Sequence, residues 1–342
     1  MPSGNGKGSS GISRLWRRLW MNPPLSWGCE ISSTGVSLAR WQTRSEGLEA
    51  AAWRPLSDGA VVVSPLHENL QRPEEVRQGL TACLESLGRG PRLSSPAGAV
   101  DTVLVIPDQA ARLFFLNFDT LPHRTAEAIP LMRWKLKKSV PFDIESCVIS
   151  YVARRHKGQW AVIAVVSPEA VIHQYEGVAE SAGLQPRFVT LTTLASLGLI
   201  PASLDEGAGK GLPNANESVL LAKYSPPWFT TAIVHDGSLC LFRTVSTGNA
   251  GNGLASLSEV LEAIYPSVAY FQDNFGAPLQ QVFLCGMGEN AGSIAESLSG
   301  ELHLYTRPLV GDFSSPAAGW DRFQTERHLA ALLGIVREQR RG

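Results

Sequence analysis

Residues 133–151 read RWKLKKSVPFDIESCVISY, a stretch that joins the end of a basic helix to a short acidic segment and then to a strand. Because proline fixes its own φ and disfavours helix at Val140, we predict that the helix ends at about Ser139. Pro130 interrupts the helical pattern, so we predict that the ordered part of the helix begins there. Trp134 predicts a second contact surface, because it lies off the apolar face formed by Ile129, Met132, Leu136 and Val140.

The composition is that of a globular protein with more than one core. A chain of 342 residues exceeds one ordinary hydrophobic core, so two or more lobes are expected. The net charge of −1 argues against bulk nucleic-acid binding, which needs many phosphate-neutralising cations. The cysteines have no zinc or redox spacing, which predicts buried thiols in a reducing cytoplasm for Cys29, Cys83, Cys147, Cys240 and Cys285.

The first 24 residues are predicted to form a basic amphipathic extension. No run reaches the roughly 18 to 20 apolar residues of a membrane span, and the N-terminus lacks the apolar core of a signal peptide. Helical spacing places one apolar face on Ile12, Leu15, Trp16, Leu19 and Trp20. The pattern is typical of a helix at an anionic membrane surface, which assigns that role to Arg14, Trp16, Arg17, Arg18 and Trp20. The alternatives are a tail helix docked on its own domain and an extension that precedes a true start at Met21.

The remaining pattern predicts two lobes that each open with a strand–turn–strand unit. A Ser-Ser-Thr-Gly turn follows the first strand at residues 32–35, and Asp236-Gly237 predicts a tight hairpin. Further strands are predicted at residues 36–41, 48–53, 102–106, 112–118, 147–153, 159–166, 187–191, 219–223, 230–235, 239–245 and 281–285. Helices are predicted at residues 73–87, 193–199, 257–274 and 321–340, and from Pro168 to a cap at Gly183.

This order resembles the actin-like ATPase fold, and specifically the type IV pilus assembly protein PilM family, over nearly the whole chain after about Trp27. Four stretches carry the resemblance: residues 121–151, 165–189 (with AGLQP at 182–186), 282–289 (VFLCGMGE) and 328–337 (HLAALLGIVR). It implies an α/β, actin-like (ribonuclease H-like) two-lobe fold with a small inserted α+β subdomain. The implied parts are a first lobe (25–107 and 167–204), the subdomain (108–166), a linker (205–217), a second lobe (218–320) and a C-terminal helix packing back on the first lobe (321–342).

The resemblance also implies a nucleotide cleft, and the chain departs from the family pattern there. In the active fold, an Asp-hydrophobic-Gly turn in each lobe supplies amides to phosphate and a carboxylate to the metal shell. Here the first turn begins at Glu30 with serine in place of glycine, and the second has Lys223 followed by Pro226-Pro227. We therefore expect a vestigial cleft formed by Glu30, Ser32, Ser33, Thr34, Lys223, Ser225, Gly286, Gly288 and Glu289.

Loss of a carboxylate and of several amides predicts little or no hydrolysis, since phosphoryl transfer depends on positioned metal and donors. No catalytic residue and no metal ligand is assigned, and no cofactor is expected. Binding of ATP and Mg²⁺ without turnover stays open as an alternative, because Lys223 could neutralise a phosphate.

The resemblance implies a non-catalytic scaffold of a type IV pilus or related secretion platform, peripheral to the inner membrane in the bacterial cytoplasm. It would bind the cytoplasmic N-terminal tail of a single-span PilN-type partner, and it could also self-associate. The expected partner-binding residues are Arg133, Trp134, Lys137, Pro141 and Phe142. One alternative is an active ATP-binding switch ATPase or kinase of the same fold, and a more remote one is the cytoplasmic part of a type II secretion platform protein. For the basic helix alone, the alternative is a solvated face.

Overall fold

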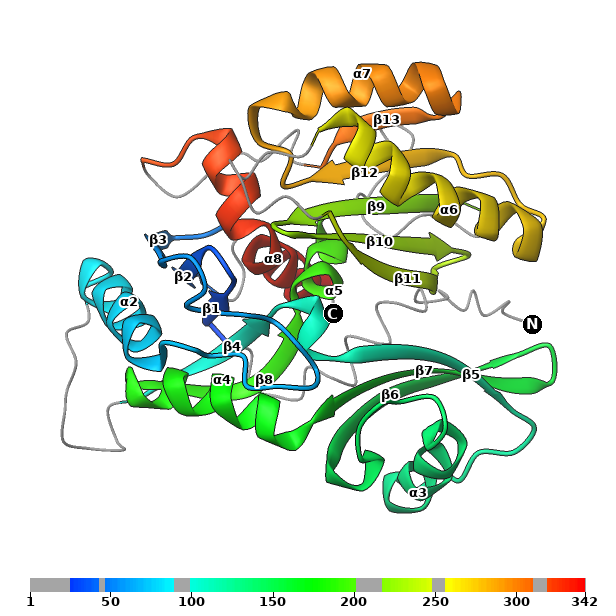
Figure 1. Ribbon diagram of the computed structural model, residues 1–342, viewed down its shortest axis with the longest axis horizontal. Coiled ribbons are helices and arrows are strands. Elements are labelled where there is room, and N and C mark those ends of the chain that lie inside the picture. The colour runs from blue at the N-terminus through cyan, green and yellow to red at the C-terminus, as the bar shows by residue number, and fades with distance from the viewer. Residues whose placement is uncertain are drawn as a thin grey trace, which may run out of the picture.

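The computed structural model describes residues 25–42, 47–88, 99–200, 217–247, 256–309 and 319–341 (Figure 1). The basic extension with Arg14, Trp16, Arg17, Arg18 and Trp20 lies outside these residues, as does most of the expected linker.

The first lobe is built on a five-stranded sheet with the order β3-β2-β1-β4-β8. Its strands are β1 (Trp27–Ile31), β2 (Gly35–Arg40), β3 (Ala50–Pro55), β4 (Val100–Ile106) and β8 (Leu184–Leu191). β1, β4 and β8 run parallel, whereas β1, β2 and β3 form an antiparallel meander. Helices α2 (Pro73–Ser86) and α4 (Glu169–Ser181) cover the outer face of this sheet (Figure 1). Val76, Leu80, Tyr175 and Val178 anchor the two helices in one hydrophobic cluster with the strands.

The second lobe repeats this plan with the strand order β11-β10-β9-β12-β13. Its strands are β9 (Ser218–Ser225), β10 (Trp228–His235), β11 (Ser238–Ser246), β12 (Gln281–Cys285) and β13 (Tyr305–Pro308). Helices α6 (Leu257–Phe275) and α7 (Ala291–Leu302) cover its outer face (Figure 1). Asp236 and Gly237 both have positive φ, of 50° and 65°, so the predicted tight hairpin turn is confirmed.

After β4 the chain leaves the first lobe, forms a third, three-stranded sheet, and returns to the first lobe before α4. Strands β5 (Arg112–Phe118), β6 (Cys147–His156) and β7 (Gln159–Pro168) have the order β5-β7-β6. One face of this sheet packs on α3 (Thr125–Leu136) and the short 3-10 helix η3 (Ile144–Ser146). We call this unit, residues 112–168, the subdomain.

The prediction that the ordered helix begins at Pro130 is wrong, because α3 starts at Thr125. A proline inside a helix removes one backbone hydrogen bond, here to the carbonyl of Ala126 in the first turn. Ala128, Met132 and Leu136 are buried along one face of the helix, and this burial offsets the lost bond. The helix ends at Leu136, slightly before the expected Ser139.

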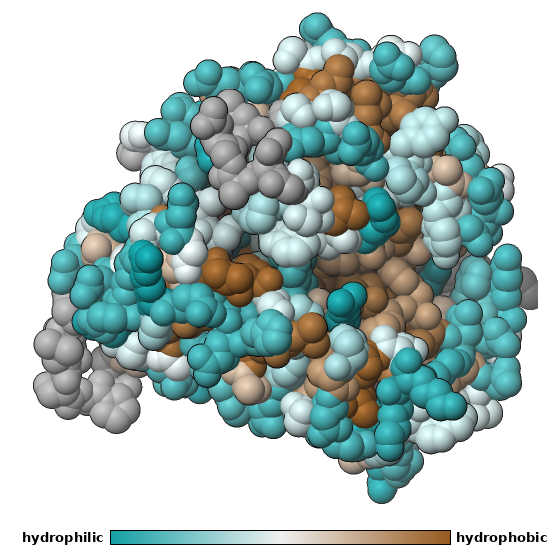
Figure 2. All heavy atoms as spheres, viewed as in Figure 1, coloured by the Kyte–Doolittle hydropathy of each residue, from teal (hydrophilic) through white to brown (hydrophobic). Residues whose placement is uncertain are grey.

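The opposite face of the subdomain sheet remains partly open. Leu113 and Ile163 on this face are half-buried against the same interlobe cluster as Phe242 of β11. Phe115, next to them on β5, keeps 43% of its surface exposed. Figure 2 shows apolar residues gathered in a hollow in the part of the view where β5, β7 and β11 come together.

The last helix, α8 (Arg322–Arg341), lies between the two lobes beside α5 (Thr192–Ser196) and the 3-10 helix η4 (Leu197–Leu199) (Figure 1). Its buried side chains join one cluster with residues of both sheets, among them Val105 and Phe283. The helix therefore contacts both lobes, and not the first alone. Gly334 allows α8 to approach α5 closely, because a Cβ there would collide with the carbonyl oxygen of Ala195.

Candidate interlobe site

The strand ends of both lobes bring polar side chains together between the two sheets. In open α/β sheets, ligand sites form at the carboxyl ends of parallel strands. In the first lobe, Glu30 stands near the end of β1, Asp108 follows β4, and Thr192 and Thr193 follow β8. Lys223 stands near the carboxyl end of β9 in the second lobe.

Asp108 is the centre of a hydrogen-bonded network that crosses between the lobes. Its Oδ1 accepts a bond from the backbone N–H of Thr193 at 3.0 Å, and its Oδ2 accepts one from the Thr193 hydroxyl at 2.5 Å. The hydroxyl of Thr230, on β10 of the second lobe, also donates to Oδ2 at 2.8 Å. Glu30 accepts a bond from the Thr192 hydroxyl at 2.5 Å. Burial raises the pKa of both carboxyl groups, while these hydrogen bonds and the charge of Lys223 act in the opposite direction.

Lys223 is enclosed at the same place, with only 4% of its surface exposed. Its Nζ lies 4.0 Å from Sγ of Cys285, the last residue of β12. Burial alone would lower the pKa of Lys223, but the Cys285 thiol and the carboxyl groups of Glu30, Asp108 and Glu326 raise it above its usual value. Two of these three carboxyl groups belong to the first lobe, so Lys223 of one lobe interacts electrostatically with carboxyl groups of the other.

The glycine turn after β12 is closed by α8. The N–H of Gly286 donates to Oε1 of Glu326 at 3.0 Å. Gly286 has a φ of +81°, and a Cβ there would collide with the carbonyl oxygen of Tyr224, so only glycine fits. Burial raises the pKa of Glu326 to about 7, against the opposing effects of the Gly286 N–H, Arg322 and Lys223.

The two turns that would face phosphate contact each other instead. The hydroxyl of Ser33, in the β1–β2 turn, donates to the carbonyl of Pro226 in the β9–β10 turn at 2.5 Å. The hydroxyl of Ser32 donates within its own turn to the carbonyl of Gly35 at 2.8 Å. Pro226 and Pro227 have no N–H groups to offer.

These residues do not fit a magnesium–nucleotide group of the kind that the fold implies. Such a group needs unpaired N–H donors for phosphate and free carboxylate oxygens for the metal. Here the Gly286 N–H is bonded to Glu326, the Ser33 hydroxyl is bonded to the Pro226 carbonyl, and Lys223 is buried near the carboxyl end of β9. Within the described ranges, no group of three or more His, Cys, Asp and Glu side chains could hold a metal ion.

The structure brings only some of the expected cleft residues together. Glu30 and Lys223 interact electrostatically, the Ser33 hydroxyl donates to Pro226 in the turn after Ser225, and the Gly286 N–H donates to Glu326. Ser32 and Thr34 bond within their own turn, Gly288 is buried, and Glu289 is exposed. The sequence reasoning missed Asp108, Thr192, Thr193, Thr230 and Glu326. The position of Asp108 and Thr192 directly after buried parallel strands is the signal that could have found them.

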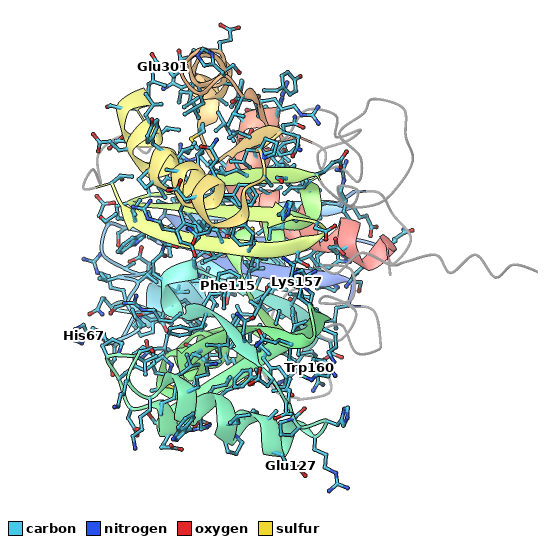
Figure 3. All side chains as sticks on the ribbon, turned by 90° about the vertical axis from the view of Figure 1, so that its right-hand side faces the viewer. His67, Phe115, Glu127, Lys157, Trp160 and Glu301 are labelled. Atoms are coloured by element: carbon cyan, nitrogen blue, oxygen red, sulfur yellow. The ribbon has the colours of Figure 1, made fainter. Side chains whose placement is uncertain are left out.

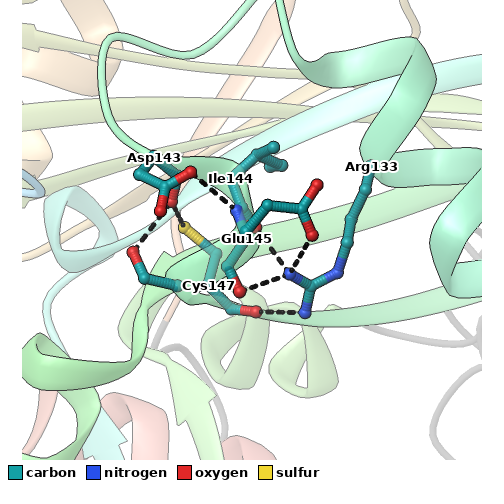
Figure 4. A network of polar contacts seen from close by, with 6 residues as sticks. Arg133, Asp143, Ile144, Glu145 and Cys147 are labelled. Atoms are coloured by element: carbon teal, nitrogen blue, oxygen red, sulfur yellow. Dashed lines mark hydrogen bonds and ion pairs between the residues drawn. The ribbon is translucent and has the colours of Figure 1, made fainter.

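The expected partner-binding residues lie together on the subdomain, with one exception. Trp134 is 76% exposed, Lys137 and Pro141 are exposed, and Phe142 is half-buried. Arg133 instead points back onto the subdomain, where its guanidinium donates to the carbonyls of Ile144, Glu145 and Cys147 at 2.8, 2.5 and 2.9 Å (Figure 4). It also lies 3.4 Å from the Glu145 carboxylate.

The described helices include none that is long and apolar enough to cross a membrane. Four of the cysteines, Cys29, Cys83, Cys147 and Cys285, are buried free thiols, and Cys240 is half-buried.

Two five-stranded sheets with α8 between them, and a small subdomain after β4, define a two-lobe protein with the actin-like fold. The chain is similar to a chain of a PilM-PilN type IV pilus biogenesis complex, with a TM-score of 0.70 and 16% identity over 93% of this chain and 99% of that chain. The expected PilM-like, actin-like fold is thereby confirmed.

Two further solved structures give lower scores. The cytoplasmic domain of EpsL, an inner-membrane component of the type II secretion system of Vibrio cholerae, gives a TM-score of 0.48 at 10% identity over 91% of this chain and 93% of that chain. A Bacteroides thetaiotaomicron protein with an actin-like ATPase fold gives 0.45 at 10% identity over 83% and 90%. Neither a protein-family model nor a curated protein matches the chain.

Proposed function

We propose that this protein is a non-catalytic, actin-like scaffold of a type IV pilus or related secretion platform, and that it binds the cytoplasmic tail of a PilN-type membrane protein. The observation that carries the proposal is the structural likeness to a chain of the PilM-PilN complex, which extends over 93% of this chain and 99% of that one. A likeness of this extent includes the subdomain as well as both lobes.

The interlobe site supports the non-catalytic part of the proposal. Phosphoryl transfer needs a metal ion and aligned donors, and the protein contributes little else to the chemistry. In this chain the corresponding groups are bonded to one another, most directly Asp108 to Thr230 and Ser33 to Pro226. These bonds support the proposal that the protein acts through its surfaces.

We place the partner contact on the α3 surface, which consists of Trp134, Lys137, Pro141 and Phe142. Large exposed aromatic side chains are enriched where proteins bind one another, and Trp134 is the most exposed of the large apolar residues described. Lys137 beside it favours a tail that carries acidic groups as well as apolar ones. Arg133 is left out of this surface, because its guanidinium is bonded to three carbonyl groups of the subdomain.

A binding experiment with a synthetic peptide tests this placement. The probe is a fluorescent peptide with the cytoplasmic N-terminal sequence of the PilN-type protein, and its Kd is measured by anisotropy. We expect the double variant Trp134→Ala, Lys137→Glu to raise Kd about tenfold or more, since aromatic anchors at interfaces contribute at least this much.

Matched changes elsewhere serve as the control. Tyr270→Ala removes another exposed aromatic side chain, on α6, and Lys157→Glu makes the same charge change at the β6–β7 hairpin. In the side view of Figure 3, Lys157 lies well apart from Glu127, which marks α3. The placement is wrong if the Trp134→Ala, Lys137→Glu variant binds the peptide as tightly as the variants Tyr270→Ala and Lys157→Glu do. A loss of binding in Phe115→Ser alone would move the contact to the open sheet face.

We also propose that the protein works at the cytoplasmic face of the inner membrane, with residues 1–20 binding anionic lipid. The support is the sequence pattern of tryptophans and arginines described above. Co-sedimentation with anionic vesicles, measured for the full chain and for a chain without residues 1–20, tests it. Equal partitioning of the two proteins would contradict the membrane role.

A further inference from the structure

The contacts between the two lobes share a feature that the proposed scaffold role does not require. Thr230 of the second lobe donates to Asp108 of the first at 2.8 Å, and the buried Lys223 of the second lobe interacts electrostatically with Glu30 and Asp108. Both lobes thus supply charged or polar groups to one buried network. We call Glu30, Asp108, Lys223 and Thr230 the charge lock.

Buried charged groups need partners, because an unpaired ion inside a protein is strongly destabilising. Asp108 has all three of its hydrogen bonds only while the lobes are together, and Lys223 interacts with Glu30 and Asp108 only in that arrangement. The network therefore favours one relative position of the lobes. All members of this network are side chains or backbone groups of the protein itself.

Helix α8 supports the same arrangement from the side. It accepts a bond from the Gly286 N–H of the second lobe through Glu326, at 3.0 Å. It also accepts one from the Trp41 indole of the first lobe through Gln339, at 2.9 Å. The helix is thereby bonded to both lobes at the two ends of its buried face.

From these contacts we propose that the charge lock holds the two lobes in a single closed arrangement without a ligand, with the Lys223 ammonium in the place between the strand ends that a bound cation or nucleotide would otherwise have to fill. The inference goes beyond the proposed function, since a scaffold can bind a tail peptide with mobile lobes or with fixed ones.

The distance between the lobes is the measurement that tests the proposal. A donor and an acceptor fluorophore, attached through unnatural amino acids at the exposed positions Glu85 on α2 and Gln272 on α6, report this distance in the full chain. For the wild type we expect one narrow distribution that ATP and Mg²⁺ leave unchanged. A distribution that narrows or shifts to shorter distance with ATP and Mg²⁺ would overturn the proposal.

A neighbouring pair of threonines provides the decisive variants. Thr230→Val removes the hydroxyl bond to Asp108 across the lobes, whereas Thr231→Val removes a hydroxyl bond to Ser267 within the second lobe, at 2.7 Å. We expect Thr230→Val to raise the population of open lobes about tenfold or more, because loss of a hydrogen bond to a charged group typically shifts an equilibrium by this factor. Thr231→Val should leave the distance distribution unchanged. Equal distributions in the two variants would refute the lock.

Lys223→Met is the second test, since it leaves Glu30 and Asp108 without their cation. We expect a broader and longer distance distribution, which is partly restored when Glu30→Gln is added. If Lys223→Met does not fold, the comparison of Thr230→Val with Thr231→Val still decides. Tail-peptide binding, measured on the same proteins, keeps a failure of the scaffold proposal separate from a failure of the lock.

Discussion

At the scale of single residues, Glu326 carries the clearest consequence for stability. It lies buried on α8 against Gly286, and burial raises its pKa from 4.5 to about 7. Between these two pH values the folded protein binds more protons at this residue than the unfolded chain does. Its contribution to the free energy of unfolding is therefore fully present below about pH 4.5 and is lost as pH rises towards 7.

Glu326→Gln should remove this pH dependence while it keeps an oxygen acceptor for the Gly286 N–H. We expect the variant to gain up to ~3 kcal/mol relative to wild type as pH rises through this window. Urea unfolding at several pH values between about 4.5 and 8 measures the difference. His328, whose pKa burial lowers to about 4, titrates in the same window but cancels in the comparison. Parallel stability curves for the two proteins would contradict the assignment.

At the scale of elements, the crossing of α8 with α5 depends on glycine. A Cβ on Gly334 would collide with the carbonyl of Ala195, and one on Gly198 with the carbonyl of Gly334. No flexible side chain is available to move aside, because the atoms in the way belong to the backbone. The helix must therefore shift if either glycine gains a side chain.

Gly334→Ala should lower the free energy of unfolding by about 2 kcal/mol or more, the usual cost of overpacking a core. Gly292→Ala on α7 is the matched control, since a Cβ there meets nothing within 4 Å. Alanine at that helical position should stabilise by up to ~1 kcal/mol. Urea unfolding of the two variants gives both values. Similar stability for both would mean that α8 adjusts without cost.

Elements with strong local patterns are the ones that the sequence predicts well. β5 and β12 have the predicted bounds, Arg112–Phe118 and Gln281–Cys285, because both are short apolar runs between polar or glycine-containing segments. α7 was not predicted, since its sequence AGSIAESLSGEL has few large apolar side chains to mark one face. The start of α3 was wrong because burial along the helix outweighed the cost of Pro130.

At the scale of the whole molecule, the interlobe site shows why the spacing of residues in the sequence was not enough to predict its full set of residues. The two threonines that bond to Asp108 are 85 and 122 positions away from it in the sequence. No local motif links such residues. The parallel pairing of β4 with β8 brings Thr193 to Asp108, and the contact between the two lobes brings Thr230 to it. The substitutions at Glu30 and Lys223 were visible in the sequence, but the closure of the site by Glu326 was not.

The same closure predicts the response of the whole protein to nucleotide. Because the Gly286 N–H and the Ser33 hydroxyl already have acceptors, we expect no saturable heat when ATP and Mg²⁺ are titrated into the full chain, and no release of phosphate. Isothermal calorimetry and a phosphate assay measure these quantities. An actin-like ATPase with both acidic turns intact is the positive control. Micromolar binding together with phosphate release would favour the active switch instead.

The two residues beside Trp134 affect the entropy cost of binding a partner at this surface. Arg133 is bonded to the carbonyl at the start of β6, and the Lys135 ammonium is bonded to the Asn117 carbonyl on β5 and lies 4.4 Å from the Phe118 ring centre. The backbone that carries Trp134 is thus tethered on both sides, although the ring itself is free. The backbone is therefore ordered before a partner binds, so association costs little backbone conformational entropy on this side of the interface.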